Sequence, residues 1–261
     1  MSGRFSKLEV VNHLSQQTDA TAQGTTRRDA AYHHGLATSA VLAGRHEHAL
    51  QAYTRCLKED RTFVPAWVGQ VQMLVELSEY DEAQLWANKA LELFKNNGDL
   101  LAAKAQACLR IGDTKSAMIA SDRAIAAPGS SPLRWMVRGE LLLSRSVPRA
   151  RDCLNKALAE PAADWFDRVL VARLLLFHQH AAAALDFAQQ AIAVHSAHPC
   201  VWLTLGNAQA ACGLTDAAVA SFQRCMQLPP RMEEAPAALE AALARSRPTS
   251  VIRRMTAWFR K

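Results

Sequence analysis

The stretch that decides the fold is WLTLGNAQAACGLTDAAVASFQRCMQLPP, residues 202–230. Ala218 and Cys225 are small and seven residues apart, so they lie on one face of a helix and let a second helix approach closely. Gly213 suits the end of a preceding helix, where a left-handed residue is preferred. Pro229 closes the stretch because proline cannot continue a helix. The stretch therefore predicts two helices joined by a short turn.

The same pattern recurs towards the N-terminus at intervals of 33 or 34 residues. One column contains only alanine: Ala49, Ala83, Ala117, Ala150, Ala184 and Ala218. Seven residues after each alanine comes another small residue: Cys56, Ala90, Ala124, Ala157, Ala191 and Cys225. A large apolar residue always follows, and no stretch alternates with the period of a strand. Six helix pairs in register are therefore predicted.

This pattern resembles the tetratricopeptide repeat (TPR) family over about residues 30–230. The last unit follows the family order W-L-G…G…A…F…A…P with Trp202, Leu205, Gly206, Gly213, Ala218, Phe222, Cys225 and Pro229. The third, fourth and fifth units are more degenerate. Ser146 to Pro148 replaces the usual turn glycine in a turn one residue short, and Gln179 replaces it in the fifth unit. The resemblance implies an all-α, right-handed superhelical solenoid of helix-turn-helix repeats whose first helices line a concave face.

The sequence predicts four segments. Residues 1–29 are expected to form an N-terminal amphipathic segment and a polar linker, because Phe5, Leu8, Val11 and Leu14 recur at helical spacing before a polar stretch. Residues 30–230 form the six-repeat solenoid, residues 231–247 a C-terminal capping helix, and residues 248–261 a basic amphipathic tail.

Composition excludes several classes of protein. Half of the residues are hydrophobic and 21% are charged, which excludes a largely disordered chain. No apolar run approaches the roughly 18 residues of a membrane span, and the first residues show no apolar secretory signal. We therefore expect a cytoplasmic protein whose six cysteines are reduced.

The positive charge is concentrated at the C-terminal end. The formal net charge is +6, and residues 247–261 contribute five bases and no acid, which leaves +1 (+6 less +5) for the rest. A solenoid that binds nucleic acid needs a basic stripe along its face. We therefore expect no nucleic-acid partner.

No set of residues has the spacing of an active site. The chain lacks a P-loop, a G-x-G-x-x-G loop and a G-x-S-x-G elbow. Histidines cluster at three places, the third being His195, His198 and Cys200, but their spacing is not that of a zinc site. We expect no enzyme activity, no metal and no cofactor.

The resemblance also implies where a partner binds, because the family's inward positions lie on the first helix of each repeat. The predicted contact residues are Val68, Gln72, Gln106, Met136, Glu140, Phe166, Val169, Arg173, Leu176 and Asn207. Apolar residues flank a central polar position, which predicts an amphipathic groove for an apolar or amphipathic protein segment. Glu140 and Arg173 either contact that partner or pair with each other. The predicted role is an adaptor, assembly factor or chaperone.

The basic tail provides an alternative. Arg253 and Arg254 lie off an apolar stripe that includes Trp258 and Phe259. Such a helix docks on its own solenoid, contacts a partner or an anionic membrane surface, or frays. The rival functions are therefore a membrane-surface scaffold and a non-catalytic subunit of an enzyme complex. Self-association is left open.

Overall fold

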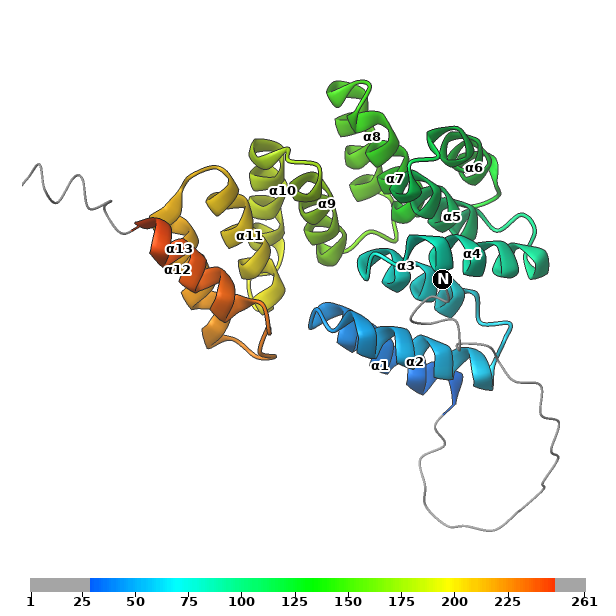
Figure 1. Cartoon of the computed structure of the whole chain (residues 1–261), viewed down its shortest axis with the longest axis horizontal. Coiled ribbons are helices and arrows are strands. Elements are labelled where there is room, and N and C mark those ends of the chain that lie inside the picture. The colour runs from blue at the N-terminus through cyan, green and yellow to red at the C-terminus, as the bar shows by residue number, and fades with distance from the viewer. Residues whose placement is uncertain (1–28, 247–261) are drawn as a thin grey trace, which may run out of the picture. The chain divides into compact units, whose positions relative to one another are not determined.

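The computed structural model describes residues 29–246, which form thirteen α-helices and no strand (Figure 1). The helices are α1 (Ala30–Leu42), α2 (His46–Glu59), α3 (Val64–Glu76), α4 (Tyr80–Leu93), α5 (Gly98–Ile111), α6 (Thr114–Ala126), α7 (Pro132–Leu143), α8 (Val147–Ala159), α9 (Trp165–Phe177), α10 (Ala181–Val194), α11 (Pro199–Ala211), α12 (Thr215–Gln227) and α13 (Ala235–Ser246). This confirms the predicted all-α chain of helix pairs. The predictions for residues 1–28 and for Arg253, Arg254, Trp258 and Phe259 lie outside the described residues.

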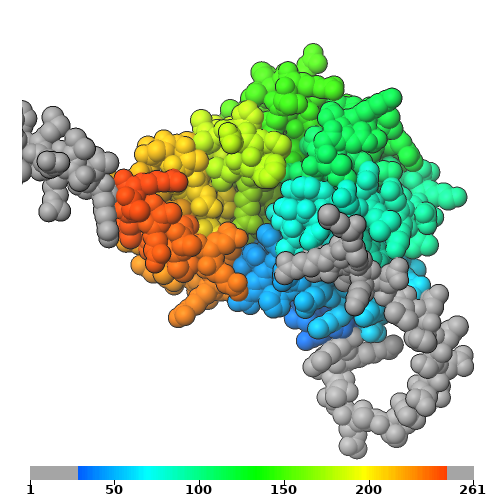
Figure 2. All heavy atoms as spheres, viewed as in Figure 1, coloured from blue at the N-terminus to red at the C-terminus, as the bar shows by residue number. Residues whose placement is uncertain are grey.

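The helices fall into two compact units, and each is described by itself. Unit 1 ends at Cys153 and unit 2 begins at Leu154, so the boundary lies inside α8. Within each unit, odd-numbered helices are the first helices of repeats and even-numbered helices are the second. Side chains fill the spaces that the ribbons leave between neighbouring helices of a unit (Figure 2).

The two columns of small residues lie where the helices cross. Every alanine of the first column, from Ala49 to Ala218, has 0% of its surface exposed, and the second column is equally buried. Gly206 shows why small residues are needed: a Cβ there would lie 2.5 Å from the ring of Phe222. The predicted register of the repeats therefore corresponds to the actual helix contacts.

Five of the six turns inside the repeats have the same geometry. The turn residue has a positive φ at Gly44, Ser78, Gly112, Gln179 and Gly213. The residue after it donates its backbone N–H to the carbonyl five positions earlier, as in Asp113 to Cys108 at 2.9 Å. In the fourth repeat Ser146 instead donates to Leu142, four positions earlier. This turn is shorter, as the sequence predicted.

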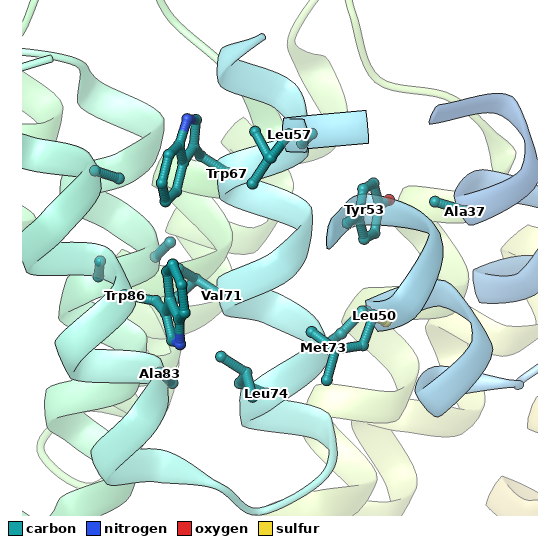
Figure 3. Close-up of a cluster of buried hydrophobic side chains, with 14 of the residues drawn as sticks. Ala37, Leu50, Tyr53, Leu57, Trp67, Val71, Met73, Leu74, Ala83 and Trp86 are labelled. Atoms are coloured by element: carbon teal, nitrogen blue, oxygen red, sulfur yellow. The ribbon is translucent and has the colours of Figure 1, made fainter. Parts of the chain in front are cut away.

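Aromatic side chains join neighbouring helices in unit 1, both within a repeat and between successive repeats (Figure 3). The rings of Trp67 on α3 and Trp86 on α4 lie 6.0 Å apart between centroids. The indole N–H of Trp67 donates to the carbonyl of Arg61 at 2.8 Å, so its polar atom is satisfied. Tyr53 on α2 packs against Gly69 on α3, where a Cβ would lie 2.3 Å from the ring. The second helix of one repeat therefore fits against the first helix of the next.

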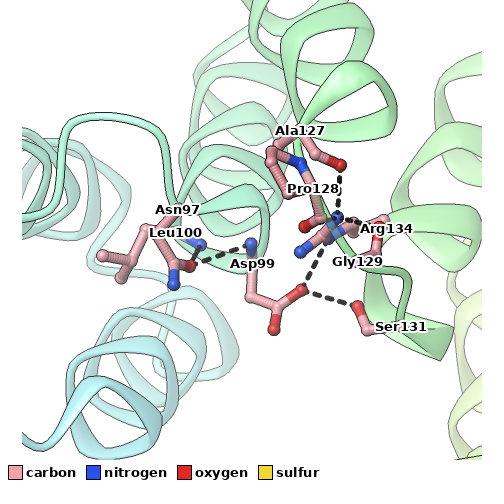
Figure 4. Close-up of polar contacts among 8 residues, drawn as sticks. All are labelled: Asn97, Asp99, Leu100, Ala127, Pro128, Gly129, Ser131 and Arg134. Atoms are coloured by element: carbon pink, nitrogen blue, oxygen red, sulfur yellow. Dashed lines mark hydrogen bonds and ion pairs between the residues drawn. The ribbon is translucent and has the colours of Figure 1, made fainter.

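A buried arginine fixes the connection between α6 and α7 (Figure 4). Arg134 pairs with Asp99 through Nε at 2.9 Å. Its Nη1 donates to the carbonyls of Ala127, Pro128 and Gly129, at 3.1, 3.1 and 2.7 Å. The guanidinium lies over Gly98, where a Cβ would be 2.2 Å from Cζ. One side chain thus holds the start of α7 to the start of α5.

Candidate functional site

The predicted contact residues lie on first helices in both units, and the surface of each unit is described by itself. We call Val68, Gln72, Gln106, Met136 and Glu140, on α3, α5 and α7, the unit-1 face. Phe166, Val169, Arg173, Leu176 and Asn207, on α9 and α11, make the unit-2 face. Within a helix, spacings of three, four and seven residues place these side chains on one side.

A buried charge cluster occupies the unit-1 face. Glu140 is only 2% exposed, and its Oε1 lies 2.7 Å from Arg110 Nη2 on α5. Gln106 donates from Nε2 to Oε2 of Glu140 at 3.3 Å. The charge of Glu140 is therefore balanced by Arg110, which the sequence analysis did not single out. Within unit 1 the carboxylate of Glu140 contacts Arg110 and Gln106, and the predicted contacts of Glu140 with a partner or with Arg173 stay predictions.

Two predicted apolar contacts belong to the interior. Val169 has no exposed surface and packs in the core of unit 2, and Met136 is 5% exposed. The helical stripe identified their side of the helix correctly, but neighbouring repeats cover them. Neither side chain is available to a partner while its unit is folded. Val68, Gln72 and Gln106 on the unit-1 face remain half-buried.

The unit-2 face combines a cation with accessible apolar surface. Arg173 is half-buried and donates from Nε to the hydroxyl of Thr204 on α11 at 3.3 Å. This is its only hydrogen bond within residues 29–246, and it engages Nε and not the terminal nitrogens. Leu176 is half-buried one helical turn further along α9, and Asn207 is half-buried at the equivalent position of α11.

The sequence analysis missed Phe177, which is the most exposed aromatic residue of this face. Its side chain is 59% exposed, and its ring meets that of His178 edge-on at 5.0 Å. Phe177 lies four residues after Arg173 and eleven after Phe166, so it belongs to the same stripe of α9. This spacing in the sequence would have been enough to predict that Phe177 lies on the same side of α9. With Leu176 it provides an apolar surface beside the guanidinium.

The histidine cluster at the start of α11 has a structural role. His198 Nδ1 accepts from the backbone N–H of Cys200 at 3.3 Å and caps the helix. The ring of His195 stacks on Trp165 at 4.4 Å. Burial raises the pKa of the Cys200 thiol to about 12, so the sulfur is protonated at neutral pH. Within residues 29–246, no three His, Cys, Asp or Glu side chains are placed to hold a metal ion.

These features define the class of protein as a helical-repeat protein of the tetratricopeptide type. Residues 201–232 match the family model for the tetratricopeptide repeat. A search of curated proteins found no match. No helix in the described part of the chain is long and apolar enough to cross a membrane.

Several solved structures are similar in fold. A tetratricopeptide repeat protein from Parabacteroides merdae ATCC 43184 is 16% identical, with a TM-score of 0.52 over 84% of this chain and 86% of its own. A thermophilic TPR protein from Thermus thermophilus is 15% identical, with a TM-score of 0.51 over 82% and 99%. The structure of the APC/C hetero-tetramer Cut9-Hcn1 is 14% identical, with a TM-score of 0.49 over 83% of this chain. This chain spans only 43% of that one.

The resemblance seen in the sequence is therefore confirmed: the chain is a solenoid of TPR-type helix pairs. Tetratricopeptide repeats are generally non-catalytic modules for protein–protein interaction, since each repeat adds surface to an extended face.

Proposed function

We propose that this protein is a non-enzymatic adaptor, assembly factor or chaperone that holds an amphipathic segment of a partner protein on its first helices. The observation that carries the proposal is the unit-2 face. There Arg173 makes one hydrogen bond within residues 29–246, through Nε, and shares one side of α9 with the exposed Phe177 and the half-buried Leu176. A few residues dominate the binding energy of a protein interface, and arginine and large aromatic residues are enriched among them.

The chemistry of this face defines the partner segment. A guanidinium binds a carboxylate through two parallel hydrogen bonds, and a pair partly shielded from water is stronger than an exposed one. Phe177 and Leu176 offer apolar area, which contributes about 25 cal/mol for each Å² removed from water. The partner therefore presents an Asp or Glu about one helical turn from one or two large apolar side chains.

The unit-1 face differs because its ionic groups neutralise each other. Glu140 and Arg110 form a pair, so the accessible polar groups are the amides of Gln72 and Gln106. Amides both donate and accept hydrogen bonds and suit a peptide backbone. The unit-1 face therefore offers uncharged hydrogen-bonding groups, whereas the unit-2 face offers a charged one.

A peptide selection tests the proposal. Peptides selected from a random displayed library on the full chain should combine an acidic residue with large apolar residues. Fluorescence anisotropy should show that Arg173→Ala and Phe177→Ala each weaken binding of a selected peptide by at least about tenfold. The matched control is Arg224→Ala, because Arg224 is exposed on the second helix α12 and its side chain bonds only Gln227 within residues 29–246.

Two results would count against this function. Selected peptides without acidic residues would contradict the role of Arg173. Equal losses in Arg224→Ala and Arg173→Ala, with unchanged helical circular dichroism, would place binding elsewhere.

A further inference from the structure

The first helix of unit 1 has an outer face that nothing in the described structure covers. Helix α1 has the sequence AAYHHGLATSAVL and carries no Asp, Glu, Lys or Arg. A surface helix normally presents charged or polar residues to water and turns its apolar side chains towards the core. Yet Tyr32 is 42% exposed and Leu36 is 43% exposed, with Gly35 and Ser39 exposed beside them.

The equivalent positions in the next two repeats show what kind of structure covers this face of a first helix. The residues one and two repeats after Tyr32 are Ala66 and Leu100, and both have no exposed surface. They are covered because the second helix of each preceding repeat packs on them, as α2 does on α3 and α4 on α5.

The glycine at the centre of the face gives the same comparison. Gly69 is the equivalent of Gly35 one repeat later, and a Cβ there would meet the ring of Tyr53 on α2. A Cβ at Gly35 would meet nothing within 4 Å. The face of α1 therefore has the composition of one that receives a helix with a large apolar side chain opposite Gly35.

The residues directly before α1 do not encode a regular second helix. The large apolar residues of α2 that pack inward are Leu50, Tyr53 and Leu57. One repeat earlier, the sequence has Gln16, Asp19 and Gln23. Residues 15–28 contain no large apolar side chain at all, so they cannot bury the face of α1.

A suitable segment lies a little further upstream. Phe5, Leu8, Val11 and Leu14 recur at helical spacing, and apart from Val10 the residues between them are polar. We propose that residues 5–14 pack on the outer face of α1 and serve as the N-terminal cap of unit 1. These residues lie outside the described part of the chain, and their sequence alone enters the argument.

Residues 15–28 connect residues 5–14 to α1. This connection makes residues 5–14 a more favourable occupant of the face than a second copy of the chain. Residues 15–28 can span up to about 45 Å when extended, whereas a helix of the length of α1 measures about 20 Å. Residues 5–14 can therefore reach any part of the face in either direction. Covalent linkage through residues 15–28 also supplies an effective concentration on the order of millimolar, which a separate molecule rarely reaches.

Hydrogen exchange on the full chain tests the cap. In the double variant Leu8→Ser/Val11→Ser, backbone amides of residues 30–42 should exchange at least about tenfold faster than in the wild type, because α1 loses its cover. Helix α5, which lies inside unit 1, should exchange as before. The matched control Glu9→Ser/His13→Ser changes the polar residues of the same segment and should leave α1 unaffected.

Light scattering on the same samples measures the mass of the protein and shows whether a second copy of the chain covers the face instead. Exchange in α1 that is equal in wild type, double variant and control would overturn the proposal. Protection of α1 that appears only at high protein concentration, together with a doubled mass, would assign the face to a second copy and overturn it too. A monomeric wild type with the selective loss in the double variant supports the cap.

Discussion

At the scale of single residues, two turn positions are occupied by side chains in a backbone conformation that favours glycine. Ser78 and Gln179 both have φ of 62°, while the equivalent positions Gly44, Gly112 and Gly213 carry no Cβ. The left-handed conformation costs an L-residue roughly 1–2 kcal/mol. The repeat contacts on both sides of the turn must outweigh this cost.

Replacing one of these residues with glycine should therefore stabilise the protein. We expect Gln179→Gly to raise the free energy of unfolding by about 0.5–1 kcal/mol, because relief of the strain exceeds the extra entropy of glycine in the unfolded chain. The reverse change, Gly112→Ala, should lower it by about 1 kcal/mol. Urea unfolding measures both. A loss of stability in Gln179→Gly would show that the glutamine makes contacts that outweigh its backbone strain.

The cap residue of α11 should make stability depend on pH. Burial, then the charges of His195 and Arg173, lower the pKa of His198 below its usual value of 6.5. Protonation would also place a hydrogen on Nδ1, which accepts the N–H of Cys200. Because the folded pKa lies below the unfolded one, this stability is complete above about pH 6.5 and is lost as the pH falls towards the folded value.

Thermal melts at pH 7.5 and 5.5 test this effect. His198→Asn keeps a capping acceptor without titrating, so its melting temperature should fall less between these pH values than that of the wild type. Burial also lowers the pKa of His34, which is unchanged in the variant and provides the common background. An identical fall in both proteins would mean that His198 does not contribute.

At the scale of elements, the connection between α6 and α7 depends on Arg134. Arg134→Ala would remove the donor to three backbone carbonyls and the ionic partner of Asp99, whose Oδ1 would keep the hydroxyl of Ser131. Asp99 is partly exposed, so we expect a loss of about 2 kcal/mol in urea unfolding. Arg134→Lys should recover only part of it, since an ammonium lacks the planar fork of donors.

The comparison for this prediction is Arg123→Ala, on the exposed surface of α6. It should change stability by less than about 0.5 kcal/mol. If Arg134→Ala were equally mild, the connection would be held by the packing of the helices alone.

The helices and their register could be predicted from the sequence because close helix crossings admit only small residues. Ala83 and Ala218 repeat for that reason, and both are fully buried. The bonds of Arg134 could not be predicted, since its partner Asp99 lies 35 positions away and the connection between them has a conformation that no local pattern specifies.

The candidate site was predictable only as a side of each helix. The spacing of Phe166, Arg173 and Leu176 indicates one stripe, but exposure depends on how deeply neighbouring repeats cover it. Val169 is therefore interior although it lies on the same stripe, and Glu140 is paired with an arginine of the preceding repeat. Pairing across repeats leaves no signature in a single helix.

At the scale of the whole molecule, the chain contains two units, and each has a face of different chemistry. The unit-1 face carries amides over a neutralised ion pair, and the unit-2 face carries Arg173 next to Phe177. The division inside α8 has no counterpart in the repeat pattern, because Ala150 and Ala157 continue both columns across it. A partner segment that binds the unit-2 face should carry an acidic group opposite Arg173.

The central claim is that first helices, not second helices, bind the partner. Hydrogen exchange of the full chain with and without a saturating selected peptide tests it most directly. The account predicts slower exchange in α9 and α11 of unit 2, with α10 and α12 unchanged, and no such effect in Arg173→Ala at the same peptide concentration. Slower exchange confined to α10 and α12, or an unchanged response in Arg173→Ala, would contradict the account.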